Sequence, residues 1–441
     1  MASAISGLPN EWLKHAPKPR PLRPGENWNV FLSYRSVNRA WVLNLYDILC
    51  QQGCSVFIDQ CALKAGDPLI RRLQDALSTS QSGVLVWSRA TEDSEWVARE
   101  YETLERLATE KKDFIFVPVA LDGSKLPAFA GSRIYLDFSS YPDGPNGGEL
   151  LRLLYALAGR PLSPEAADFA LEQDEAAQIA AVKIGAALRN GRPERIMELA
   201  SAGGLPWDTS PGLACKAAEA LTRLNRNADA ITILDRARQR FPRAVRPKQL
   251  YALALARRAG ANDLDNAQQI LGELYESGER DPETLGIYGR TWMDRYALSH
   301  DFGDLRQSRD LYAEAFERAP DDYYTGINAA AKSVFLGSAE SIARAGEYAA
   351  RVQEIVGDGP RAGDYWWTAT VAEVFLMRKQ YADAGRLYEA AVRMAPKEIA
   401  SHETTWRQAC RLMQKLNPTA GERRAVRDSF AHLPDCDQLQ L

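Results

Sequence analysis

The sequence lacks the signatures of several common functional classes. Its 441 residues contain neither a G-x-G-x-x-G nor a G-x-x-x-x-G-K-[ST] motif, which argues against a Rossmann-type dehydrogenase and against a P-loop NTPase. The six cysteines form no C-x-x-C pair and the four histidines have no ligand spacing, so we expect no metal. No run of about 18 apolar residues occurs, and the N-terminus has no apolar core of signal-peptide length. We therefore expect a cytoplasmic protein without membrane contact, whose cysteines are mostly small buried hydrophobes and not disulfides or nucleophiles.

The sequence also has no large excess of positive or negative charge. The 54 Lys and Arg residues are opposed by 58 Asp and Glu residues, and the net charge is -4. This balance provides no broad positive field, so nucleic acid is not an expected partner. With 46% hydrophobic residues, the chain is long enough for two or three domains, each with its own core.

The N-terminal part alternates between short apolar runs and amphipathic stretches. Residues 1–26 are basic and proline-rich, which predicts a flexible leader, although Trp12 and Leu13 are candidates for docking on the rest of the chain. Five apolar runs then follow: Val30–Leu32, Val56–Ile58, Val84–Trp87, Phe114–Val119 and Ile134–Leu136. Continuous apolar strands separated by helices indicate a parallel sheet that helices cover on both faces. We predict a flavodoxin-like α/β domain over residues 27–160, with strand order 2-1-3-4-5.

The C-terminal part reads as helical repeats. Residues 161–174 are interpreted as a linker, and Ala-rich helical patterns occupy residues 175–441. Prolines recur after helical segments at intervals of 40, 38, 40 and 36 residues: Pro242, Pro282, Pro320, Pro360 and Pro396. Each interval accommodates two antiparallel helices, and the small-x3-aromatic pattern resembles tetratricopeptide repeats, although the units exceed the usual ~34 residues. We predict an all-α, TPR-like solenoid, an architecture that commonly binds ligands or proteins.

In the predicted sheet order, ligands bind beyond the carboxyl ends of strands one and three, where the winding direction reverses. The first of these strands ends in Ser33-Tyr34-Arg35, and the third is followed by Ser88. Trp96 and Glu100 lie four residues apart in the next helical pattern, which places them on one face of that helix.

These residues occur within a recognisable series of motifs. The series is Asn29-Val-Phe-Leu-Ser-Tyr-Arg35, Val56-Phe-Ile-Asp59 with Leu63-Lys-Ala-Gly-Asp67, Val86-Trp-Ser88, and Ser94-Glu-Trp-Val-Ala-Arg-Glu100. It resembles the successive boxes of a Toll/interleukin-1 receptor (TIR) domain in order and spacing. Many family members have Cys where Val97 stands, a difference that we expect the packing to tolerate.

The resemblance implies either an NAD+ glycohydrolase or an adaptor, since TIR domains serve as both. In catalytic members the essential glutamate lies four residues after the aromatic residue, and Glu100 occupies that position. NAD+ is then the substrate, and no cofactor is expected. Nicotinamide leaves as a neutral pyridine, so one carboxylate that stabilises the oxocarbenium-like transition state can suffice. The predicted substrate-binding residues are Ser33, Tyr34, Arg35, Asp59, Ser88 and Trp96.

Three segments of the helical part have a resemblance of their own: Leu285–Asp294, Tyr323–Ala330 and Trp366–Glu373. They are similar to a tetratricopeptide-type sensor module of bacterial immune proteins and certain stress-activated kinases. That module is thought to sense a ligand or a partner. Tyr323, Asn328 and Trp366 are equally consistent with repeat-core and turn positions, and Arg290 with Asp294 is consistent with an ordinary helix-face ion pair.

The resemblances together predict an immune, antiphage effector in which an unknown ligand or protein trigger at the repeats drives TIR self-association and NAD+ hydrolysis. Two alternatives stay open. The TIR domain could be a non-catalytic scaffold for protein–protein signalling, or it could cyclise its product into a cyclic ADP-ribose signal. Hydrolysis and cyclisation differ only in whether water or an adenine nitrogen captures the cation.

Overall fold

The computed structural model describes residues 7–58, 69–89, 95–123 and 134–439, without the side chains of residues 36, 69–71 and 95–100. The chain divides into two compact units, Met1–Arg258 and Ala259–Leu441. Each unit is described on its own below.

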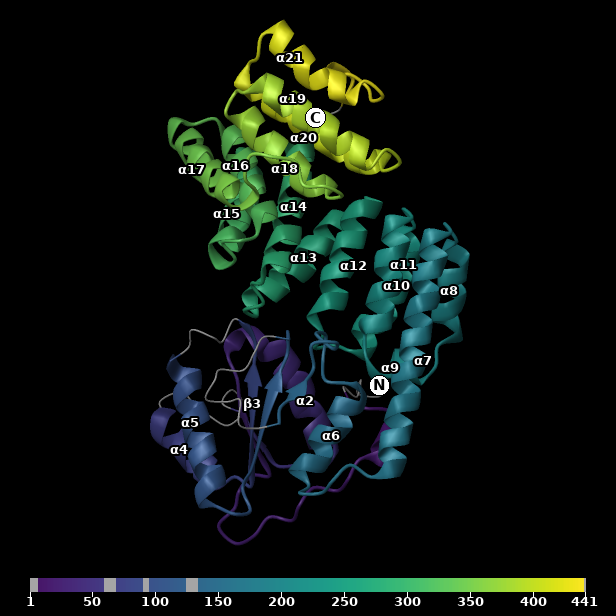
Figure 1. Ribbon diagram of the computed structural model, residues 1–441, viewed down its shortest axis with the longest axis vertical. Helices are drawn as coiled ribbons and strands as arrows, with labels where there is room; N and C mark the ends of the chain where they lie inside the picture. The colour runs from purple at the N-terminus through teal and green to yellow at the C-terminus, as the bar shows by residue number, and fades with distance from the viewer. Residues whose placement is uncertain (1–6, 59–68, 90–94, 124–133, 440–441) are drawn as a thin grey trace. The chain divides into compact units, whose positions relative to one another are not determined.

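The first unit contains the predicted parallel sheet (Figure 1). Its strands are β1 (Val30–Ser33), β2 (Val56–Phe57), β3 (Ser82–Trp87), β4 (Ile115–Ala120) and β5 (Leu136–Asp137). They are ordered β2-β1-β3-β4-β5, and all neighbouring pairs are parallel. The predicted strand order is confirmed, although β5 begins only at Leu136 because Ile134 and Tyr135 are exposed.

Alternate strand residues enter two separate cores. Val30, Leu32, Val84 and Val86 pack with helices α2 (Arg39–Gln51) and α6 (Gly147–Leu157). On the opposite face, Phe31, Leu85 and Trp87 pack with α4 (Leu69–Ser78) and α5 (Glu95–Glu110). In Figure 1, α4 and α5 accordingly lie on one side of the strands and α2 and α6 on the other. Burial on both faces explains why the strands are continuous apolar runs.

The leader is packed from residue 7 onward, so the prediction of a flexible segment is wrong there. It contains a short helix, α1 (Asn10–His15), whose Trp12 is 1% exposed and meets Phe169 edge-on at 5.2 Å between ring centroids. Gln51 exchanges two hydrogen bonds with the Leu8 backbone, of 2.8 and 3.0 Å. The prolines keep the chain extended, but Leu8 and Trp12 find apolar partners that are distant in sequence.

The segment 161–174 is also not an irregular linker, because helix α7 (Pro164–Arg189) begins inside it. Ser163 caps this helix by accepting a hydrogen bond from the Ala166 N–H, and Pro164 takes the first helical position, where a missing N–H costs nothing. Asp174 then joins α7 to the sheet domain. Its carboxylate accepts hydrogen bonds from the Tyr141 hydroxyl, at 2.8 Å, and from the Gly148 N–H, at 3.1 Å.

Helices α8 to α12 complete the first unit: α8 (Pro193–Ala202), α9 (Leu205–Thr209), α10 (Gly212–Arg223), α11 (Asn227–Arg240) and α12 (Val245–Arg258). The chain after α11 contacts the sheet domain, because Arg243 forms a bidentate ion pair with Asp47 of α2.

A buried carboxyl group, Asp143, lies in the same unit. Burial raises the pKa of Asp143 to about 6; the positive charge of Arg246 opposes this shift, and the negative charge of Glu219 adds to it.

Asp143→Asn should make the chain more stable at neutral pH. Because the folded state raises the pKa of this carboxyl, its ionisation above pH 6 costs stability, and asparagine removes that cost. We expect a gain of about 1–2 kcal/mol at pH 7 that shrinks as pH falls from 6 to 4 and both proteins become neutral at this position. Urea unfolding at pH 4 to 8 measures it. Asp168→Asn, at an exposed position of α7, should have no such effect; a destabilised Asp143→Asn at pH 7 would contradict the argument.

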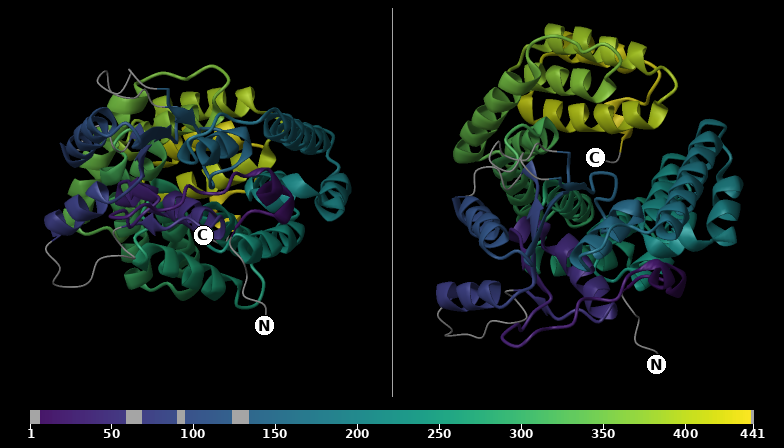
Figure 2. Two further views of the ribbon diagram at one scale, coloured as in Figure 1. Left: turned by 90° about the horizontal axis from the view of Figure 1, so that it is seen from below. Right: turned by 60° about the horizontal axis from the view of Figure 1, so that its bottom comes forward.

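The second unit is built of helix pairs. Its main helices are α13 (Asp263–Glu276), α14 (Pro282–Ser299), α15 (Phe302–Arg318), α16 (Tyr323–Leu336), α17 (Ala339–Val356), α18 (Tyr365–Met377), α19 (Tyr381–Met394), α20 (Ile399–Leu416) and α21 (Ala420–Arg427). From α13 to α19 each helix packs against the next, and α19 also packs on α21; the green and yellow helices of Figure 2 follow this stack. The recurring prolines mark the junctions between helix pairs, which confirms the predicted repeats: Pro242, Pro320, Pro360 and Pro396 lie between one pair and the next, and Pro282 is the first residue of α14.

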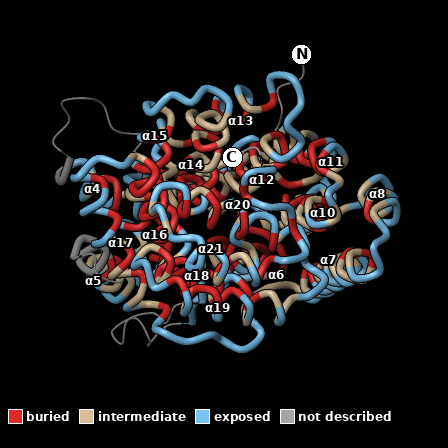
Figure 3. Tube along the Cα trace, turned by 90° about the horizontal axis from the view of Figure 1, so that it is seen from above, coloured by how far each residue is buried: buried red, intermediate tan, exposed pale blue. Residues whose placement is uncertain are grey.

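We call α14, α16, α18 and α20 the inner helices. Helix α16 packs on both α18 and α20, α18 also packs on α20, and Met293 of α14 belongs to the same buried apolar cluster as residues of these three helices. The intervening helices α15, α17 and α19 pack between or beside them. Helix α16 is buried along most of its length, as the red stretches in Figure 3 show. An inner helix buried to this extent has room for charged side chains only where they find partners.

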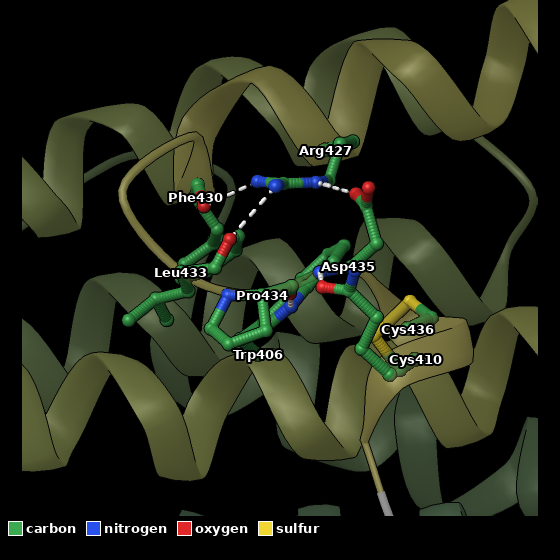
Figure 4. Close-up of a disulfide and its surroundings, with 9 residues drawn as sticks. Trp406, Cys410, Arg427, Phe430, Leu433, Pro434, Asp435 and Cys436 are labelled. Atoms are coloured by element: carbon green, nitrogen blue, oxygen red, sulfur yellow. Dashed lines mark hydrogen bonds and ion pairs between the residues drawn. A yellow bond between two sulfur atoms is a disulfide. The ribbon is translucent and has the colours of Figure 1, made fainter.

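The C-terminal segment folds back along α20 (Figure 4). Cys410 and Cys436 form a disulfide with a Cα–Cα distance of 5.5 Å, so the expectation that these two cysteines are unpaired hydrophobes is wrong. The Trp406 indole N–H donates to the Pro434 carbonyl at 2.8 Å, and His402 and His432 are joined by a 2.9 Å hydrogen bond. These contacts bring positions 26 residues apart together, which no local pattern indicates. Cys215 is buried as predicted, whereas Cys50 is exposed.

No helix within the described residues combines the length and the apolar content needed to cross a membrane.

Candidate active site at the carboxyl edge of the sheet

Two serines mark the edge where strands β1 and β3 end. Ser33 is the last residue of β1 and is 2% exposed, and Ser88 follows β3 directly and is 6% exposed. The two strands are adjacent and parallel, with Ser33 paired to Leu85. The structure therefore brings Ser33 and Ser88 to the same edge, at the point where the winding direction of the sheet reverses.

Asn38 connects the loops that follow these strands. Its side-chain amide donates to the Ser88 hydroxyl at 3.1 Å, and its backbone N–H donates to the Arg35 carbonyl at 2.8 Å. Asn38 ends a short 3-10 helix, η1 (Ser36–Asn38), and is 8% exposed. The sequence analysis missed this residue, although an amide side chain so close to a strand end and just ahead of a helix is a usable signal.

A second link joins the loops after β3 and β4. The Arg89 backbone N–H donates to the Asp122 carboxylate at 2.6 Å. Asp122 was also missed, and it too follows a strand end within a few residues. The Asn38 and Asp122 contacts together fix three neighbouring loops at the carboxyl edge of the sheet. Loops held in this way form a preorganised surface for a bound ligand.

Tyr34 and Arg35 have different surroundings. Tyr34 is half-buried, and its ring packs against the core shared by α2 and α6. The Arg35 side chain is exposed, as is that of Arg89. The described part of this edge thus combines neutral hydroxyl and amide groups with two outlying guanidinium groups, a combination that can bind hydroxyl groups and an anionic group such as phosphate.

The predicted catalytic helix is anchored firmly beyond Glu100. Tyr101 and Leu104 of α5 are buried, and Tyr101 meets Phe116 of β4 edge-on at 5.3 Å between ring centroids. Trp96 and Glu100 lie in the first turns of this helix, but their side chains are outside the described residues, as is all of Asp59. Their roles remain predictions. No group of three or more His, Cys, Asp or Glu side chains in the described parts could hold a metal ion.

In the helical part, two of the singled-out residues have local partners. The Asn328 amide donates to the Tyr324 carbonyl at 2.9 Å, within its own helix. Tyr323 meets Trp367 edge-on at 5.2 Å between ring centroids, as a packing residue would. Trp366, by contrast, is 46% exposed. Arg290 and Asp294 form the i,i+4 ion pair, at 3.7 Å between Nε and Oδ2.

Comparisons with known proteins identify both parts of the chain. A family model described as TIR domain matches residues 30–153, and one described as Tetratricopeptide Repeats-Sensor matches residues 226–333. The chain carries a TIR domain followed by a tetratricopeptide repeat sensor domain. The TIR match includes β1 to β5, and the sensor match includes α11 to α15 with most of α16.

Curated relatives are similar over a short part of the chain. Proteins named probable 2' cyclic ADP-D-ribose synthase TcpB, from Brucella melitensis biotype 1 and Brucella abortus, are 34% identical over 80 residues, which is 18% of this chain and 32% of each relative. The chain thus spans about a third of the length of these relatives. Among solved structures, a thermophilic TPR protein of Thermus thermophilus covers 47% of the chain and aligns over 100% of its own length, with 15% identity and a TM-score of 0.36.

A double-mutant cycle on Asn38→Ala and Ser88→Ala tests the link between the two loops. We expect a coupling energy of about 0.5–1.5 kcal/mol in urea unfolding, the net contribution of one buried hydrogen bond. Asn38→Ala combined with Ser139→Ala, at an exposed position, should give additive effects. Additivity in the Asn38–Ser88 cycle would show that the 3.1 Å contact does not hold the loops together.

Proposed function

We propose that the TIR domain cleaves the nicotinamide–ribosyl bond of NAD+. The observation that carries this proposal is the TIR match over residues 30–153, because the predicted carboxylate, Glu100, lies within it on the helix that follows β3. The printed name of the Brucella relatives, a probable synthase of a cyclic ADP-ribose, supports chemistry on the same glycosidic bond. Ser33 and Ser88 at the adjacent strand ends supply hydroxyl groups for substrate binding.

In the proposed reaction the C1'–N bond breaks heterolytically and its electron pair goes to the pyridine nitrogen. Nicotinamide leaves as a neutral molecule and needs no proton from an acid. The Glu100 carboxylate stabilises the cationic ribosyl group that develops, which is electrostatic catalysis by a fixed anion. Water then adds to C1' and loses a proton, giving ADP-ribose. Trp96 provides a flat wall for a substrate ring, Tyr34 and Arg35 contact its polar groups, and the loop of Asp59 borders the site.

Glu100→Gln should abolish nicotinamide release by the full chain while leaving the fold intact, because the amide keeps the size of the side chain and removes its charge. We expect a loss of about 10²-fold or more in kcat, typical of removing one transition-state stabilising group. Chromatography of the reaction mixture measures it. Glu102→Gln, at an exposed position two residues further along α5, is the matched control and should keep full activity. Equal activity in both variants would refute the assignment of Glu100.

Cyclisation is a second candidate, favoured by the printed name of the Brucella relatives. An adenine nitrogen or a ribose hydroxyl of the same molecule would then capture the cation instead of water. The Glu100 assay separates the products: ADP-ribose identifies a hydrolase and a cyclic ADP-ribose identifies a cyclase. A wild-type chain that releases no nicotinamide at any concentration would favour the third reading, a scaffold that acts through TIR association alone.

We further propose that the chain is a cytoplasmic, antiphage immune effector whose sensor domain controls assembly of the TIR domains. The adjacency of a TIR and a sensor domain on one chain supports this pairing of trigger and response. A ligand or protein bound at the repeats would shift the population toward an assembled state in which neighbouring TIR domains complete each other's sites.

If assembly controls the activity, NAD+ cleavage per chain should rise with protein concentration. While the active assembly is scarce and forms from two chains, its concentration rises as the square of the chain concentration. A plot of the logarithm of activity per chain against the logarithm of chain concentration then has a slope of about one. Assays over a hundredfold range, with light scattering on the same samples, measure the dependence. The Glu100→Gln chain mixed with wild type tests whether an inactive subunit still supports assembly. Concentration-independent activity in a monomeric chain would contradict the proposal.

A further inference from the structure

The inner helices of the second unit hold a group of charged and amide side chains that are buried or partly buried. We call it the inner-helix cluster: Arg290 and Asp294 of α14, Asn328 and Lys332 of α16, Glu373 of α18, and Gln408 and Arg411 of α20. Lys332 is 3% exposed and Glu373 is 8% exposed. Residues of this type are seldom buried in repeat cores without a specific partner or task.

Part of the cluster is internally satisfied. The Lys332 ammonium donates to the Asn328 side-chain oxygen at 2.5 Å and to the Gln408 side-chain oxygen at 3.3 Å. The Gln408 amide donates to the Glu373 carboxylate at 2.6 Å. Lys332 also lies 5.1 Å from the centre of the buried Tyr312 ring. This chain of contacts holds three inner helices in a fixed arrangement around one buried ammonium group.

The two arginines are far less satisfied. The Arg290 Nε is buried without a hydrogen-bond partner among the described residues, and its nearest carboxylate oxygen, on Asp294, is 3.7 Å away. Arg411 is partly buried and makes no hydrogen bond or ion pair to any residue that the structure describes. Guanidinium groups have five donors in a planar fork, and both of these partly buried arginines lie near one carboxylate, because each opposes the rise in the pKa of Asp294.

The charged groups of the inner-helix cluster shift one another's pKa values. Burial lowers the pKa of Lys332 to about 7, with Glu373 and Asp294 opposing the shift and both arginines adding to it. Burial lowers the pKa of Arg411, and the exposed Arg407 beside it adds to the shift. Three basic side chains of the cluster, Arg290, Lys332 and Arg411, thus share a region with two carboxyl groups. These belong to Asp294 and Glu373, and burial raises the pKa of both. Partly buried positive charge in excess is costly until an anion compensates it.

From this geometry we propose that the inner-helix cluster binds a small anion, a phosphate or carboxylate group of a ligand, between Arg290 and Arg411. The fork geometry of a guanidinium group matches both anions with two parallel hydrogen bonds. Lys332, which both arginines influence electrostatically, adds a basic group. Tyr324, which is 48% exposed and packs on Tyr312 at 6.3 Å between ring centroids, offers an exposed aromatic surface on the same helix as Lys332. The inference concerns binding to the sensor domain and does not depend on NAD+ cleavage.

The test uses the full chain without NAD+ and two probes, inorganic phosphate and malonate, with sodium chloride at equal ionic strength as the reference. We expect one or both probes to raise Tm by about 3 °C or more over chloride and to bind at one site per chain in calorimetry. A response to phosphate alone assigns a phosphorylated ligand, and a response to malonate alone assigns a carboxylate ligand. Equal effects of phosphate, malonate and chloride would overturn the proposal.

Variants locate the site. Arg290→Gln and Arg411→Gln should each weaken anion binding at least tenfold, the loss of one charge-assisted contact. Arg344→Gln removes an exposed arginine that pairs with Glu340 on α17 and is the matched control. Since Arg290 and Arg411 lie on different helices, a parallel loss in both variants, with unchanged circular dichroism, cannot come from one local distortion. Wild-type affinity in either variant would remove that arginine from the site and overturn the proposed pairing.

Discussion

The hydrogen bonds of Asp174 determine how the repeats begin. This carboxylate on α7 accepts from the Tyr141 hydroxyl and from the N–H of Gly148, so the first long helix after the TIR domain is bound to the loop that opens α6. Gly147 makes this approach possible: its φ is +71°, and a Cβ there would lie 2.2 Å from the Tyr141 hydroxyl oxygen and 2.8 Å from Asp174. A larger residue would separate the two helices. Helices α8, α9 and α10 pack on α7, so this contact contributes to where they lie in the first unit.

The contacts that connect the TIR domain to the first repeats come from one face of the sheet. The leader helix α1, the α2 carboxylate Asp47 and the loop before α6 meet α7 and the segment after α11. Helix α5, which carries Glu100, packs on the opposite face. Within the described residues of the first unit, the contacts to the first repeats given above thus lie on the face of the sheet opposite to α5. This separation favours control through the association of whole TIR domains over control through a local rearrangement of the site.

How much of the fold and of the candidate site the sequence predicts depends on how far apart along the chain the interacting residues lie. The strands and their order were predictable because burial on both faces produces continuous apolar runs, and the recurring prolines predicted the helix pairs. Trp12 was ambiguous, because its partner Phe169 lies far along the chain and proline-rich composition says nothing of it. The roles of Asn38 and Asp122 arise only where loops from neighbouring strands meet. Ser33 and Ser88 were placed correctly by strand topology, whereas the roles given to Glu100, Trp96 and Asp59 still rest on the family resemblance.

The two kinds of charged contact in the second unit differ in what they can contribute. Pairs such as Arg344 with Glu340 lie on exposed helix faces, where water screens them and each contributes a few tenths of a kcal/mol at most. Lys332 and Glu373 are withdrawn from water, so their desolvation opposes their attraction, and apolar side chains of similar size would pack between the inner helices at less cost. Stability alone thus gives no reason for a lysine at the centre of α16. The Lys332 ammonium, held by Asn328 and Gln408 and accompanied by Arg290 with its buried, unpartnered Nε, fits the proposed anion, whose binding would recover part of the cost of keeping these charges there.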